Sequence, residues 1–77
     1  MQAANAVKKL TKAGFTIAKN GNRYNATANG QVIRFIEQSD RIICINVRSA
    51  NDHDDAMTDY SAGVYCDNIS QAIRLAH

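Results

Sequence analysis

Residues 15–48 read FTIAKNGNRYNATANGQVIRFIEQSDRIICINVR. Four runs rich in β-branched and aromatic residues alternate here with short turn signals, and two of these turns contain Asn-Gly. Asn-Gly supplies the positive φ angles of a two-residue type I′ turn, which makes it a strong hairpin signal. The stretch therefore predicts a four-stranded antiparallel meander.

The turns also predict which side chains share a face, because side chains alternate along a strand. We place two-residue turns at Asn20-Gly21 and Asn29-Gly30. For the third turn, a two-residue loop at Ser39-Asp40 competes with a three-residue loop from Gln38 to Asp40. We favour the three-residue loop, since it gathers the apolar residues of the last strand on one side. The predicted inner face then contains Phe15, Ile17, Tyr24, Ala26, Ile33, Phe35, Ile43, Ile45 and Val47.

Both segments that flank the sheet show helical periodicity. Residues 2–13 place apolar side chains at helical spacing and three lysines on the opposite side, and Gly14 followed by Phe15 is typical of a helix stop. We interpret the lysine stripe as a solvated helix face, with phosphate binding as the alternative. Near the end of the chain, Asp67 or Asn68 begins a second helix with an apolar stripe of Ile69, Ala72, Ile73 and Ala76.

Two short helices with narrow apolar stripes suit one role, which is to cover the inner face of the sheet. The sequence therefore predicts one α+β domain over residues 1–77, an α-β-β-β-β-α two-layer sandwich with both helices on one face. A chain of 77 residues is near the lower limit for a self-sufficient core.

Composition bounds the function further. A net charge of +2 is too small to make nucleic-acid binding the default, and two cysteines are too few for a disulfide framework. We find no signal peptide and no apolar run of membrane length, so we expect reduced thiols, a cytoplasmic protein and no membrane contact. A single disulfide between Cys44 and Cys66 is the alternative.

The segment from Ser49 to Gly63 is polar, acidic and long for a connection in so small a domain. Its carboxylates could collect a hard cation, but the spacing is not that of an EF-hand loop. We therefore predict no metal and no cofactor. In our interpretation Asp59, Tyr60 and Gly63 serve the fold, while the exposed acids available to a partner are Asp52, Asp54 and Asp55.

Residues 51–73, NDHDDAMTDYSAGVYCDNISQAI, resemble small domains of phage and mobile-element proteins, the large polyvalent protein associated domains. Residues 14–27, GFTIAKNGNRYNAT, have the matching helix, aromatic and hairpin pattern. The motif-like positions are Asp59, Tyr60 and Gly63, and Ser61 stands where an aromatic residue is expected. The resemblance implies mobile-element origin and no established catalytic residues. Stand-alone versions of such folds serve phages as inhibitors of host defence, including anti-CRISPR proteins.

We expect no enzyme, because the best nucleophile, Cys44, is tied to neither His53 nor His77 by any obvious spacing. A non-catalytic protein-interaction module that inhibits a host defence complex such as a CRISPR effector is the predicted function. Apolar side chains among arginines are typical of interfaces, and a homodimer through this face is an alternative. A nucleic-acid-binding accessory protein is the less favoured hypothesis, since the face lacks aromatic residues for base stacking. The predicted outer-face site contains Arg23, Val32, Arg34, Ile36, Ile42 and Arg48.

Overall fold

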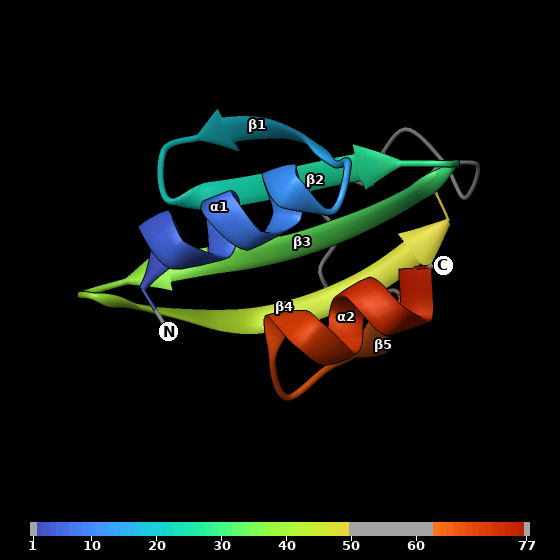
Figure 1. Cartoon of the computed structure of the whole chain (residues 1–77). Helices are drawn as coiled ribbons and strands as arrows, with labels where there is room; N and C mark the ends of the chain where they lie inside the picture. Colours follow the sequence, from blue (N-terminus) through green and yellow to red (C-terminus); the bar gives the residue numbers. More distant parts are fainter. Residues whose placement is uncertain (1, 50–62, 77) are drawn as a thin grey trace.

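The computed structural model describes residues 2–49 and 63–76, which form a two-layer α+β fold (Figure 1). The strands make one antiparallel sheet in the order β1-β2-β3-β4-β5, and both helices lie on the same face of it. The predicted architecture is confirmed, with one short strand added after β4. The elements in chain order are α1 (Ala3–Lys12), β1 (Thr16–Asn20), β2 (Arg23–Ala28), β3 (Gln31–Gln38), β4 (Arg41–Ser49), β5 (Val64–Tyr65) and α2 (Ile69–Ala76).

Neither described helix is long and apolar enough to span a bilayer. Helix α1 instead ends in the stop that its sequence predicts. The Phe15 backbone N–H donates to the Leu10 carbonyl at 3.0 Å, and the Gly14 N–H donates to the Thr11 carbonyl at 3.0 Å. These two bonds define a Schellman motif, and its apolar partners Leu10 and Phe15 are both buried in the core.

Helix α2 begins at a side-chain cap. The Asn68 carboxamide oxygen accepts a hydrogen bond from the Gln71 backbone N–H at 2.8 Å, as an N-cap residue should. The Gln71 side chain reaches back to the Asp67 N–H at 2.7 Å, one residue before the position that a capping box uses. Of the two predicted caps, Asn68 is the one that caps the helix.

The two Asn-Gly turns behave differently. Asn29 and Gly30 both have positive φ, as a type I′ turn requires, and Ala26 pairs with Ile33 as predicted. The first turn is shifted by one residue, because Asn20 pairs with Arg23 and the loop is therefore Gly21-Asn22. This correction moves the pairing register by two residues, so every side chain of the hairpin stays on its predicted face.

The third turn corrects the prediction in a more consequential way. Gln38 pairs with Arg41, so the loop has two residues and not three. A β-bulge then places both Cys44 and Ile45 opposite Phe35, and Cys44 takes a φ of 55°. The extra residue reverses which side chains of β4 face the helices beyond the bulge. Ile45 and Val47 therefore point toward the core, which is the result that the predicted three-residue loop would also have given.

The two-residue turn exchanges two side chains before the bulge between the predicted faces. Ile42, predicted on the outer face, packs against the core, while Ile43, predicted on the inner face, pairs with outward-facing Ile36. Beyond the bulge, Ile45 and Val47 face the helices as predicted and are buried.

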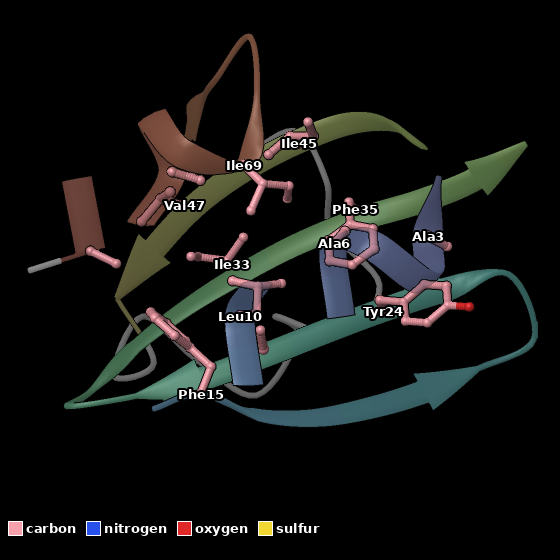
Figure 2. Packing of buried hydrophobic residues seen from close by; sticks show 13 residues of the cluster. Ala3, Ala6, Leu10, Phe15, Tyr24, Ile33, Phe35, Ile45, Val47 and Ile69 are labelled. Atoms are coloured by element: carbon pink, nitrogen blue, oxygen red, sulfur yellow. The ribbon is translucent and has the colours of Figure 1, made fainter. Parts of the chain in front are cut away.

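The core lies between the helices and the inner face of the sheet. Figure 2 shows Leu10 of α1 and Ile69 of α2 directed toward Ile33 of β3, and none of these three side chains is exposed. Full burial of one such side chain stabilises the fold by about 1.5–3 kcal/mol. Tyr24 and Phe35, paired across β2 and β3, stack with ring centroids 4.9 Å apart.

Polar contacts hold Tyr24 at the edge of this core. Its hydroxyl donates to a Glu37 carboxylate oxygen at 3.0 Å, and the Lys19 Nζ lies 5.5 Å from its ring centroid. The buried ring therefore keeps its polar end paired, as an amphipathic aromatic residue in a core must.

Gly63 lies tightly against the backbone of β4. A Cβ atom there would lie 2.7 Å from the Val47 carbonyl oxygen and 3.1 Å from the Arg48 Cβ, and φ is +100°. Strain at such a φ and overpacking each cost about 1–3 kcal/mol. We expect Gly63→Ala to lower the free energy of unfolding by about 2–6 kcal/mol in equilibrium urea denaturation.

Gly21→Ala is the matched control. Gly21 also has positive φ, but an added Cβ would meet nothing within 4 Å, so the expected loss is only the left-handed backbone cost of about 1–2 kcal/mol. Equal losses for the two variants would contradict the close approach of Gly63 to β4.

Candidate functional site

The outer face of the sheet, opposite the helices, carries a row of buried polar side chains. Asn25, Arg34 and Asn46 lie directly opposite one another on β2, β3 and β4. Arg34 and Asn46 have no exposed surface, and Asn25 is 4% exposed. Strand alternation predicted the face of these residues correctly but did not predict their burial.

This burial corrects half of the predicted binding site. Val32, Arg34 and Arg48 were expected to be exposed, but all three are buried in the folded chain. The expectation rested on two helices covering one face only, whereas the centre of the sheet is buried on both faces. A side chain that is already buried is not available to anchor a partner.

The remaining residues of the predicted site divide in two. Arg23 is exposed and Ile36 half-buried, and they pair across β2 and β3 on the outer face. Ile42 faces the core instead, and Ile43 takes its expected place beside Ile36. A short row of Arg23, Ile36 and Ile43 near the β3–β4 turn is what is left of the predicted patch.

The predicted residues of the long loop fall mostly outside the described ranges. This applies to the three acids proposed to meet a partner and to two of the three residues proposed to serve the fold: Asp52, Asp54, Asp55, Asp59 and Tyr60. The third, Gly63, precedes β5 and lies against the backbone of β4.

A different group of apolar side chains is exposed at the last strand and helix. Val64, Tyr65 and Leu75 are 59%, 53% and 50% exposed, and we name them the edge cluster. β5 is the last strand of the described sheet, and α2 lies beside β4 on the helix-bearing face (Figure 1). The edge cluster therefore lies along one edge of the sheet. Val64 pairs with inward-facing Val47 and shares the helix side with Leu75, whereas Tyr65 pairs with outward-facing Asn46 and lies on the other face.

A hollow of about 300 Å³ opens beside the edge cluster. Val64 and Leu75 form part of its wall, so exposed apolar surface continues into a concave site. Concave apolar sites with a few polar groups are the usual form of binding pockets. The other lining residues are Gln31, Val47, Arg48, Ser49 and Gly63.

Sequence reasoning missed the edge cluster, although part of the signal was present. Leu75 lies outside the apolar stripe of α2, which the buried residues Ile69, Ala72 and Ala76 define. An apolar residue off the buried stripe of a helix is a candidate surface contact. Val64 and Tyr65 belong to a short apolar run of β-forming residues, but nothing local indicated that this run would pair with β4 beside α2.

The described residues include two free thiols, Cys44 exposed and Cys66 half-buried. Burial, reinforced by the negative charge of Asp67, raises the pKa of the Cys66 thiol, so less of it is in the nucleophilic thiolate form. Within residues 2–49 and 63–76, no three His, Cys, Asp or Glu side chains gather to hold a metal ion.

Neither a protein-family model, nor a curated protein, nor a solved structure matches this chain. The resemblance of residues 51–73 to phage domains stays a prediction.

Arg34 is buried and Arg23 is exposed on the same face of the sheet, so the same substitution at each position should affect stability differently. We expect Arg34→Glu to lower the free energy of unfolding by about 3–5 kcal/mol, because it places a carboxylate where a cation is fully buried. Arg23→Glu, the same change at an exposed position, should stay within about 0.5 kcal/mol of wild type. Equal stability of the two variants in urea denaturation would contradict the burial of Arg34.

The thiols should differ in reactivity. With iodoacetamide at neutral pH, the folded protein should gain one rapid adduct at Cys44 and a slower one at Cys66, since Cys66 is less exposed and its pKa is raised. Peptide mapping after a timed quench measures both rates. Denatured protein that has seen no reductant should take two adducts, and the absence of both would establish a disulfide.

Proposed function

We propose that this protein is a non-catalytic interaction module whose protein partner docks on the edge cluster. The observation that supports this is the exposure of Val64 and Leu75, which line the hollow, together with the exposure of Tyr65 on the same edge strand. Exposed apolar residues beside a concavity are typical of protein-interaction sites, and Tyr65 adds an exposed aromatic side chain on the other face of the same strand.

The free energy available from burying the edge cluster indicates which further contacts a partner must make. Burying a whole Val or Leu side chain yields about 1.5–3 kcal/mol, and these side chains are already about half buried. Three half-burials yield about 2–4.5 kcal/mol together, which reaches at most the lower end of an association cost of about 4–15 kcal/mol. The partner must therefore also form hydrogen bonds at this site.

The edge of the sheet can provide those bonds. β5 pairs with β4 on one side and is the last strand of the described sheet. An extended segment that pairs with the backbone of Val64 and Tyr65 would gain main-chain hydrogen bonds, while an apolar side chain enters the hollow. Gln31 and Ser49 line the same hollow and offer polar contacts at its rim.

The identity of the partner rests on the phage-domain resemblance alone. On that basis the partner is a host protein of a defence complex such as a CRISPR effector, met in the bacterial cytoplasm. The alternative of nucleic-acid binding through the outer-face arginines is weakened, because Arg34 and Arg48 are buried and only Arg23 of the three is exposed.

Substitution of Leu75 tests the edge cluster. We expect Leu75→Asp to leave the protein folded with a loss of about 1–2 kcal/mol, because half of the Leu75 side chain is buried and the acid enters the last turn of α2. Loss of an anchor of this kind should weaken capture of the partner at least tenfold. The measurement compares, by mass spectrometry, the proteins that immobilised wild type and variant retain from bacterial lysate.

Thr27→Asp is the control, since it adds the same charge at an exposed position of β2 on the outer face. Capture that survives Leu75→Asp but not Thr27→Asp would move the interface to the outer face. If sedimentation shows that the wild type is a dimer and that Leu75→Asp is a monomer, the partner at the edge cluster is a second copy of the chain.

A further inference from the structure

The helix layer carries a concentration of positive charge. Lys8, Lys9 and Lys12 of α1 and Arg74 of α2 are all exposed, and we name this surface the helix face. They are four of the seven exposed basic residues in the described ranges, since Arg34 and Arg48 are buried. The helix layer is therefore strongly basic, although the net charge of the whole chain is only +2.

The two helices form one continuous surface. They contact each other over the same face of the sheet (Figure 1), and the Lys9 Nζ donates a hydrogen bond to the Ser70 hydroxyl across their seam. Lys12 lies one turn beyond Lys8 on α1, and Arg74 lies one turn beyond Ser70 on α2. The charges therefore extend over both helices and do not form a single stripe.

No acidic side chain offsets this charge within the helices, because neither α1 nor α2 contains Asp or Glu. The described acids lie elsewhere: Glu37 accepts from Tyr24, Asp40 lies in the β3–β4 turn, and Asp67 precedes α2. Like charges held close together repel, so the helix face favours an anionic partner.

The neighbouring side chains indicate which anion. Asn5 and Thr11 are exposed on α1, and Ser70 and Gln71 are half-buried on α2, so hydroxyl and amide groups accompany the basic residues. No aromatic residue belongs to either helix, and Leu75, the exposed large apolar residue of α2, lines the hollow at the edge. A protein interface needs apolar anchors, and single-stranded nucleic acid needs aromatic rings for stacking.

We propose that the helix face binds the phosphate backbone of duplex nucleic acid, without base specificity. Lysines are mobile point charges that suit phosphates, and amide and hydroxyl groups also contact phosphate oxygens. The proposal goes beyond the protein-binding function because it uses different residues on a different surface. A protein that docks a partner at its edge could in this way be held on nucleic acid at the same time.

Salt dependence measures the number of phosphate contacts. Four contacts predict that log K falls with log [salt] at a slope of about −3.6, so affinity drops about 150-fold between 50 and 200 mM salt. The probe is a fluorescent 20-base-pair DNA duplex of arbitrary sequence, followed by anisotropy. A second duplex of unrelated sequence should bind with the same affinity.

Charge removal on the helix face is the decisive comparison. The double variant Lys8→Gln/Lys12→Gln should reduce the slope by about 1.8, and Arg74→Gln alone by about 0.9. The control Arg23→Gln/Arg41→Gln removes the same charge at exposed strand positions and should leave the slope unchanged. Thermal melting monitored by circular dichroism verifies that each variant is folded.

Four results would overturn the proposal. These are no duplex binding at 50 mM salt, an equal effect of the control variant, tighter binding of the single strand, or competition by polyglutamate as effective as that by duplex. The last result would identify an acidic protein surface as the ligand of the helix face. None of these outcomes affects the edge cluster, which Leu75→Asp tests separately.

Discussion

The β-bulge in β4 is the constraint on which the rest of the structure depends. Cys44 and Ile45 together face Phe35, and this extra residue shifts the alternation of β4 by one position. Without the shift, Asn46 and Arg48 would point at the helices, and Ile45 and Val47 would leave the core. The shift also places Ile45 so that its carbonyl accepts from the Cys66 N–H at 2.8 Å, which brings the last segment of the chain against β4.

The edge cluster follows from that docking. Gly63 lacks a Cβ and can therefore approach the Val47 carbonyl closely, after which Val64 and Tyr65 pair with β4. A strand of two residues buries little, so both side chains stay largely exposed. The feature that supports protein binding is thus a consequence of a short strand closing the sheet beside α2.

The buried positions of both helices are mostly alanine, which leaves the rest of each helix surface available for basic residues. Ala3 and Ala6 of α1, and Ala72 and Ala76 of α2, occupy the buried positions together with one larger side chain from each helix, Leu10 and Ile69. The helices therefore pack on the sheet through narrow stripes, and most of each helix circumference remains at the surface. The basic residues of the helix face take those surface positions and leave the core free of charge.

Local signals determined much of this protein. The Schellman stop at Gly14, the cap at Asn68 and the Asn29-Gly30 turn each depend on a few adjacent residues, so the helices and the central hairpin could be predicted from sequence. The error of one residue at the first turn left both faces correct, because it moved the pairing by an even number.

Tertiary structure decided the rest. A two-residue loop followed by a bulge and a three-residue loop both place Ile45 and Val47 inward, and only strand pairing distinguishes them. Alternation assigns a side chain to a face, but burial depends on everything packed against that face, which is why Arg34 could be placed correctly and its exposure could not. The hollow brings Val64 of β5 together with Leu75 of α2, and proximity of that kind exists only after the chain has folded.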